Sequence, residues 1–298
     1  MIAFGCAITD EDTYGRLAEP GLQRTLEGDS ILYANVSAGS IFRNYNQILK
    51  QAREVEGLEA LVLLHQDAII EDPDFLAKVR AAVAEPEVAI VGCAGALDVR
   101  NIAWWEGSVK WAAFSHRYDE MGGGEIAGMN WYGVDAPAFA GLGDVQTVDG
   151  FVLIFTPWAI ENLSFDESLP GGLHGYDFDI CMQAQAAGKR VIVADLKVAH
   201  HHSLDVVSDI SAWVNAHVAL SEKWQHQLPM PDENWERRAR RAEAELSSSI
   251  MGRSSDAWIY DIRIAQLERE LERVHESSSW KLTKPLRWLN ARLGRGGE

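Results

Sequence analysis

Residues 147–203 constrain the fold and the chemistry of this chain more than any other stretch. An apolar run at 151–155 predicts a buried strand, a glycine-rich loop follows at 170–172, and residues 176–179 form an acidic helix start. A second apolar run then ends in three consecutive histidines at 200–202. Because these carboxylates and imidazoles sit at the edges of apolar elements, a folded domain can hold them together in one pocket.

The residues before this stretch alternate between strand-like and helix-like patterns. Apolar runs predict buried strands, and amphipathic segments predict helices, in this order: strands at 2–8 and 30–36, a helix at 42–54, a strand at 58–70, a helix at 73–84 and a strand at 88–93. Such alternation indicates a parallel α/β sheet, whose ligands bind beyond the carboxyl ends of the strands. Thr9, Asn35 and Asp67 fall at these ends.

The composition limits the kinds of ligand. The 298 residues, 47% of them hydrophobic, suit one domain at 1–230 with an appendage at 231–298. The net charge of −17 argues against a nucleic-acid partner, because binding of that kind needs a basic surface. An anionic ligand would have to be met by a metal ion, by helix N-termini or by a few arginines.

The cysteines and the N-terminus bear on location. Three cysteines lie far apart in apolar runs, which favours reduced core residues of a cytoplasmic protein. No basic, apolar signal segment is visible at the N-terminus, and no apolar run reaches the roughly 20 residues of a spanning helix. We expect a cytoplasmic protein that is soluble or attached to the inner face of a membrane.

Residues 95–143 lose regular periodicity and are rich in glycine and tryptophan. Irregular segments of this length inside a domain are usually lids or binding loops. Trp104 and Trp105 could offer flat apolar faces to a sugar ring, or could simply pack the loop onto the sheet. Both interpretations remain open from the sequence.

The C-terminal extension has a different composition. A charged helix is predicted at 232–246, followed by a serine-rich break, and apolar residues within 260–274 then repeat at heptad spacing. This segment fits docking on the domain or assembly into a homodimer equally well. The tail at 277–298 is basic and amphipathic, which suggests a helix lying on an anionic membrane surface or an end that packs on another subunit.

Asp67 and the three histidines are candidate metal ligands, because a carboxylate and imidazoles can hold a divalent cation together with water and substrate oxygens. Alternation along a strand places His200 and His202 on one face and His201 on the other. We expect Asp67 with His202 or His200 as the ligand set, and His201 in a structural role.

The order of motifs in the second half resembles that of family 2 glycosyltransferases, nucleotide-sugar-dependent enzymes with the GT-A fold. Asp149 and Gly150 precede the strand, residues 165–167 form the family's Phe-Asp-Glu turn, and residues 175–181 (GYDFDIC) match its G-E-D-x-D-x-C/A helix start. An Ala-Gly turn and a strand ending in histidine follow. The match extends over about 55 residues.

The first half resembles the family more loosely. Residues 42–46 are similar to its A-R-N-x-G helix start, and residues 65–67 stand at the place of its DxD motif. Two positions depart from the pattern. His65 replaces the first acid of DxD, and Tyr176 replaces the glutamate of the E-D pair.

The resemblance implies a GT-A (Rossmann-like) fold, with a mixed, mainly parallel sheet flanked by helices and a C-terminal helical or coiled-coil extension. It implies that Asp177 is the catalytic base and that Asp67 binds Mn²⁺ or Mg²⁺. The remaining assignments that we make are Thr9, Asn35, Arg43, His65 and Asp67 at the nucleotide sugar, and Asp149, Gly150, Trp104 and Trp105 at the acceptor.

The expected activity is inverting transfer of a sugar from a UDP- or dTDP-sugar to a hydroxyl acceptor, a carbohydrate or glycolipid of surface-polysaccharide synthesis. Asp177 could instead cap its helix, a common role of aspartate at a helix start. The alternative function is a non-catalytic carbohydrate- or nucleotide-binding scaffold that assembles through its C-terminal helices.

Overall fold

The computed structural model describes residues 1–36, 39–104, 107–118, 124–125, 131–132, 143–170, 172–202, 209–228, 235–285 and 287. The chain divides into two compact units, Met1–Met230 and Pro231–Glu298.

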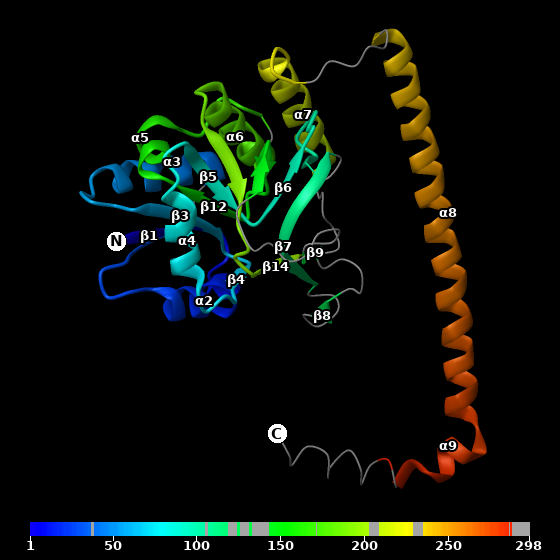
Figure 1. Ribbon diagram of the computed structural model, residues 1–298. Coiled ribbons are helices and arrows are strands. Elements are labelled where there is room, and N and C mark those ends of the chain that lie inside the picture. The colour runs from blue at the N-terminus through cyan, green and yellow to red at the C-terminus, as the bar shows by residue number, and fades with distance from the viewer. Residues whose placement is uncertain are drawn as a thin grey trace. The chain divides into compact units, whose positions relative to one another are not determined.

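A seven-stranded sheet forms the centre of the first unit, in the order β10-β13-β5-β12-β3-β1-β2. Its strands are β1 (Ile2–Ile8), β2 (Ile31–Val36), β3 (Ala60–His65), β5 (Val88–Gly92), β10 (Gly143–Val145), β12 (Val152–Phe155) and β13 (Arg190–Val193). Figure 1 labels its strands β1, β3, β5 and β12. β1 pairs in parallel with β2 and β3, and β13 pairs in parallel with β5. β12 runs antiparallel between β3 and β5, and β10 runs antiparallel to β13. The mixed, mainly parallel α/β sheet expected from the sequence is confirmed.

A second sheet has the order β11-β6-β7-β14-β4, with β8 and β9 paired to β7. Its strands are β4 (Ala68–Ile70), β6 (Ala94–Leu97), β7 (Ser108–Tyr118), β8 (Gly124–Glu125), β9 (Trp131–Tyr132), β11 (Thr147–Val148) and β14 (Val198–His202). β4 follows β3 in the chain and pairs antiparallel with β14. This pairing brings the strand that carries the histidines beside the end of β3.

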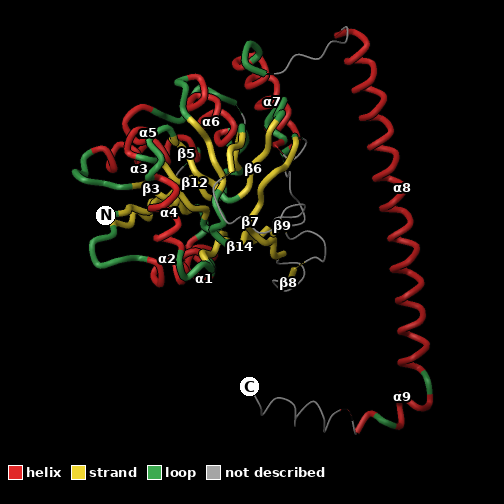
Figure 2. The backbone as a smooth tube through the Cα atoms, in the orientation of Figure 1, coloured by secondary structure: helices red, strands yellow, loops and turns green. Residues whose placement is uncertain are grey.

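Helices cover both faces of the main sheet (Figure 2). They are α1 (Glu11–Arg16), α2 (Ala18–Thr25), α3 (Ile41–Arg53), α4 (Phe75–Val83), α5 (Pro157–Asn162), α6 (Tyr176–Ala186) and α7 (Ile210–Trp224). α3 and α5 pack on one face, and α2 and α4 pack on the other. α6 contributes side chains to both hydrophobic clusters and so joins them.

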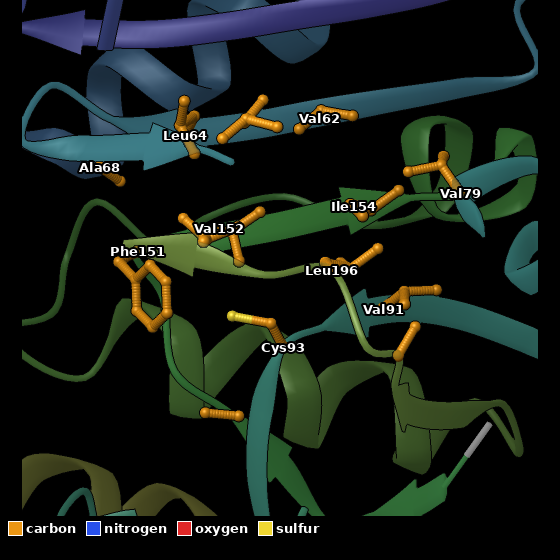
Figure 3. Close-up of a cluster of buried hydrophobic side chains, with 14 of the residues drawn as sticks. Val62, Leu64, Ala68, Val79, Val91, Cys93, Phe151, Val152, Ile154 and Leu196 are labelled. Atoms are coloured by element: carbon orange, nitrogen blue, oxygen red, sulfur yellow. The ribbon is translucent and has the colours of Figure 1, made fainter. Parts of the chain in front are cut away.

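Alternation along the strands builds the two clusters. On β3, Val62 and Leu64 face one cluster, while Leu61 and Leu63 face the other. Figure 3 shows the first cluster, where Val62 and Leu64 lie near Val152 and Ile154 of the antiparallel strand β12. The three cysteines are buried with free thiols, as the sequence predicts.

The second strand differs from its prediction. We expected residues 30–36 to be buried, but β2 is the edge strand of the sheet, and its residues are half-buried or exposed. Only β1 pairs with it in the described residues, so one side of the strand gains no neighbour. The apolar side chains of β2 therefore pack against the sheet's neighbours without being fully buried.

Two further predictions need correction. The single strand expected at 58–70 breaks after His65 into β3 and β4, which belong to different sheets. The region at 95–143, expected to be irregular, contains β7, a strand of 11 residues. The pairing of β7 with β6 and β14 stabilises this strand, and such long-range pairing overrides weak local periodicity.

The second unit consists of α8 (Trp235–Glu276) and α9 (Ser278–Leu282). The serine-rich break expected after 246 is absent, because α8 continues through those residues. Serine costs only a few tenths of a kcal/mol in a helix relative to alanine, so three serines do not end one. Within the described residues, no helix is both long and apolar enough to cross a membrane.

Candidate active site

His65, Asp67 and His200 form one cluster at the edge where the two sheets meet. His65 is the last residue of β3, Asp67 lies in the turn before β4, and His200 lies on β14. The backbone N–H of His201 donates to the carbonyl of Asp67 at 2.8 Å, which fixes the turn against β14. The Asp67 carboxylate oxygen Oδ1 lies 3.4 Å from Nε2 of His200 and 3.7 Å from Nδ1 of His65.

The donor set of this cluster fits a divalent cation. Each residue offers one ligand atom, and these atoms all lie within 4.8 Å of one another. The His200 ring is buried and stacks on Phe151 with 4.4 Å between centroids, so its orientation is fixed. One carboxylate and two imidazoles suit Mn²⁺, with Mg²⁺ relying more on oxygen ligands. Burial lowers the pKa of His65, although the negative charge of Asp67 acts in the opposite direction. The lower pKa favours the neutral ring, which can bind a metal.

The second nitrogen of His65 contacts helix α6. Nε2 lies 2.5 Å from the hydroxyl of Tyr176, the first residue of that helix. Tyr176 is buried, and a Cβ at Gly150 would overlap its hydroxyl. Gly150 is therefore required for the close approach of the Tyr176 side chain.

Asp177 lies next to Tyr176 in the first turn of α6. Its Oδ2 accepts a hydrogen bond from the N–H of Gly150 at 3.0 Å, and its Oδ1 accepts one from Phe178 at 2.8 Å. Burial raises the pKa of this carboxyl to about 7, and the charge of Asp149 adds to the rise. The N-cap residue of α6 is Gly175, with φ of 80°, so Asp177 does not occupy the capping position.

The carboxylate of Asp149 accepts hydrogen bonds from two groups. Its Oδ2 accepts from the indole N–H of Trp104 at 2.9 Å, and its Oδ1 accepts from the N–H of Phe151. Trp104 is buried in the core, which agrees with the packing interpretation of that side chain. Trp105, also expected at the acceptor, lies outside the described residues.

Asp179 is occupied by structural contacts. Its Oδ1 accepts from the indole N–H of Trp224 at 2.8 Å and forms an ion pair with Lys223 at 2.8 Å, while its Oδ2 accepts from Gln183. The carboxylate is buried and thereby ties α6 to α7. No local sequence pattern indicates this link, because Lys223 and Trp224 lie more than 40 residues away in the chain.

The other expected contacts are placed as follows. Thr9 exchanges hydrogen bonds with Gln66, the residue between His65 and Asp67, so the end of β1 lies beside the cluster. Asn35 lies near the end of the edge strand β2. Arg43 is exposed and pairs with Glu167, so its described ion pair belongs to the junction of α3 with the Phe-Asp-Glu turn.

The structure describes the side chains of two of the three consecutive histidines at 200–202. His200 joins the cluster, whereas His201 is half-buried and its side chain does not belong to this group of ligand atoms. The backbone of His202 ends β14, but its side chain lies outside the described part of the chain. His65 enters the cluster in addition to the expected Asp67 and His200. The sequence signal for this was available, since a histidine stood at the DxD position.

A family model and a curated relative each match about two thirds of this chain. A family model described as "Glycosyltransferase like family" matches residues 29–223. The streptomycin biosynthesis protein StrF of Streptomyces griseus is 28% identical over 204 residues, which cover 68% of this chain and 67% of that protein.

A solved structure shares the fold of the first unit at low sequence identity. GalNAc-T7, solved with UDP, GalNAc and Mn²⁺, is similar with a TM-score of 0.50 and 11% identity. The alignment covers 76% of this chain and 48% of the GalNAc-T7 chain. The mixed sheet with its flanking helices is thus the arrangement of a known glycosyltransferase.

Proposed function

The chain belongs to the glycosyltransferase-like family, and on this basis we propose that it is a metal-dependent, inverting enzyme. It transfers a sugar from a nucleoside diphosphate sugar to a hydroxyl group of a carbohydrate or glycolipid. The observation that carries this proposal is the contact of His65 with Tyr176, which sets the candidate metal ligands beside Asp177.

Departure of a nucleoside diphosphate places negative charge on a phosphate oxygen, and the chain carries a net charge of −17. His65, Asp67 and His200 would hold Mn²⁺ or Mg²⁺, which acts as a Lewis acid on the diphosphate when bound. GalNAc-T7, with the same fold, was solved with UDP and Mn²⁺, which supports this assignment. Thr9, Asn35 and Arg43 are proposed contacts of a UDP- or dTDP-sugar.

Asp177 is proposed as the general base. The acceptor hydroxyl must lose its proton as it attacks the anomeric carbon, and a pKa of about 7 suits a carboxylate that removes it near neutral pH. Its hydrogen bonds to the N–H groups of Gly150 and Phe178 hold the group in place without protonating it. Direct attack from the face opposite the leaving group inverts the anomeric centre.

The acceptor is proposed to bind beside Asp177, and the basic tail is proposed to hold the enzyme at a membrane. Asp149 and Gly150 lie next to Asp177 in space, and with Trp105 they are the proposed acceptor side, whereas the buried Trp104 supports Asp149 from the core. The basic tail at 277–298 would hold the enzyme at the inner face of a membrane, where glycolipid intermediates of polysaccharide synthesis lie. Of this tail, the structure describes residues 277–285 and 287.

The proposal is tested by nucleotide release from a panel of UDP-, dTDP- and GDP-sugars, with and without Mn²⁺. Release that depends on Mn²⁺ and is lost in Asp67→Ala supports the enzyme. Tight nucleotide or sugar binding without release from any donor and acceptor would favour the scaffold instead.

A further inference from the structure

Both departures from the family pattern meet in one contact. His65 stands where the first acid of DxD is expected, Tyr176 stands where a glutamate is expected, and their side chains lie 2.5 Å apart. We infer that Tyr176 is a positioning residue that orients His65 for metal binding. This inference rests on the proposed metal site.

The two ring nitrogens of His65 face different partners. Nε2 faces the Tyr176 hydroxyl, and Nδ1 faces the Asp67 carboxylate at 3.7 Å. A metal ligand needs a free lone pair, so Nδ1 can bind a cation only when the ring proton is on Nε2. The Tyr176 oxygen then accepts that proton in a hydrogen bond, which fixes both the tautomer and the ring rotation.

The surroundings of Tyr176 hold its ring in a single place. Phe42, Tyr45 and Phe165 surround it with centroid distances of 6.1, 5.8 and 6.0 Å. Gly150 leaves the space that the hydroxyl needs. A rigid aromatic ring therefore presents its oxygen at a fixed point, as a flexible carboxylate side chain would not.

Tyr45 offers a matched control. It is buried in the same aromatic cluster, and in the described part of the chain its hydroxyl has no hydrogen-bond partner. Tyr45→Phe and Tyr176→Phe remove the same atom from neighbouring rings. Only the second removes a hydrogen bond to His65.

The experiment is Mn²⁺ titration by calorimetry of the full-length, metal-free protein. Tyr176→Phe should weaken Mn²⁺ binding about 10- to 100-fold, the usual effect of losing the partner of a ligating histidine, while Tyr45→Phe leaves it unchanged. Equal affinity of Tyr176→Phe and the wild type, or an equal loss in both variants, overturns the inference. Asp67→Ala tests the metal site separately from the role of Tyr176. If this variant binds Mn²⁺ as tightly as the wild type, the proposed metal site itself is wrong.

A second measurement uses the wild-type protein and therefore requires no variant. Nitrogen-15 NMR of labelled histidines in the wild type with diamagnetic Zn²⁺ bound should show His65 protonated on Nε2. Protonation on Nδ1 would contradict the inference.

The long helix α8 carries an independent inference. Tyr260, Ile264, Leu267, Leu271 and Val274 are all exposed, with accessible fractions of 47 to 67%, and follow one another at spacings of four and three. In this register the apolar seam is the segment 260–274, since the preceding seam positions are Ala257 and the charged Arg253.

The charges beside this seam favour a second copy in parallel. In this register Arg263 takes a g position and Glu268 the following e position, which face each other across a parallel two-stranded coiled coil. Glu270 and His275 occupy the same two positions one heptad later, and Asp256 and Asp261 occupy them one heptad earlier, so Arg263 and Glu268 are the oppositely charged pair of this segment. We propose that α8 forms a parallel homodimer through this seam.

Sedimentation velocity of the full-length protein over a range of concentrations tests the dimer. Ile264→Asp should convert the dimer to a monomer, while Ile262→Asp, an exposed isoleucine outside the seam, should not. Arg263→Glu should weaken the dimer, and adding Glu268→Arg should restore it. A wild type that is monomeric at all concentrations overturns the proposal, whether the helix then docks on its own domain or on a membrane. In a parallel dimer, Tyr260→Cys should form a disulfide between the two copies rapidly. Failure to form that disulfide also overturns the proposal.

Discussion

Oδ2 of Asp177 accepts a hydrogen bond from the backbone N–H of Gly150 at 3.0 Å. The contact joins the first turn of α6 to the residues between β11 and β12. It holds the carboxylate beside Asp149 and one residue from Tyr176, whose hydroxyl reaches His65. This hydrogen bond and the contact of Tyr176 with His65 thus hold the proposed base near the candidate metal ligands.

Asp177→Asn should lower turnover about 10²- to 10⁴-fold, because an amide cannot remove the acceptor proton. Asparagine has the same size, but its single oxygen can keep only one of the two hydrogen bonds from the N–H groups of Gly150 and Phe178, so stability should fall by about 1 to 3 kcal/mol while nucleotide affinity changes little. Turnover, melting temperature and nucleotide affinity are measured on the same preparation. Wild-type turnover in this variant would show that the base lies elsewhere.

The rate should rise with pH through the pKa of Asp177, about 7, because only the ionised carboxylate can accept a proton. Asp149→Asn should move this limb to lower pH, since the charge of Asp149 raises that pKa. For stability the sign is opposite. A carboxyl whose folded pKa lies above its unfolded value of 3.8 stabilises the fold at low pH, and this contribution falls as pH rises through about 7. A limb that stays in place in Asp149→Asn would contradict the assignment.

Asp179→Ala should destabilise the first unit by about 2 kcal/mol, because the indole N–H of Trp224 and the ammonium of Lys223 lose their shared acceptor. Chemical denaturation measures the change. Asp166→Ala is the matched control: it removes a more exposed partner of the same lysine and should cost less. Equal losses of unfolding free energy in the two variants would show that the buried carboxylate of Asp179 contributes no more than the more exposed one of Asp166.

Asp67→Ala should abolish the part of nucleotide binding that depends on a divalent cation. The remaining imidazoles of His65 and His200 lack the charged ligand between them. Calorimetry with UDP, in Mn²⁺ and in excess chelator, gives the two affinities, and Asp12→Ala serves as an exposed control. Equal affinities of the wild type in Mn²⁺ and in chelator would remove the metal from the proposal.

Removal of residues 277–298 should leave turnover on a soluble acceptor analogue intact and weaken binding to anionic vesicles. The motive is the basic character of this tail on a chain of net charge −17. Co-sedimentation with anionic and with neutral vesicles measures the change. Unchanged binding to anionic vesicles after truncation would exclude the tail as an anchor.

The sequence by itself determined the fold class and the order of the motifs. Continuous apolar runs such as residues 2–8 favour buried strands of a parallel sheet, and their alternation with helices leaves few topologies. It also singled out Asp67 and Asp177 and narrowed the histidine ligand to His200 or His202, because each of these residues stands at the end or start of an apolar element. Local pattern suffices for such features because burial of an element's apolar face fixes where the polar ends emerge.

The tertiary structure alone decided which of these side chains meet. The antiparallel pairing of β14 with β4 selects His200 for the cluster, and the approach of α6 to Gly150 brings Tyr176 to His65 across 111 residues of chain. Pairing across the second sheet likewise makes a strand of residues 108–118, which lack a clear period of their own. Contacts between distant segments depend on the whole packed core, so no local pattern of residues could specify them.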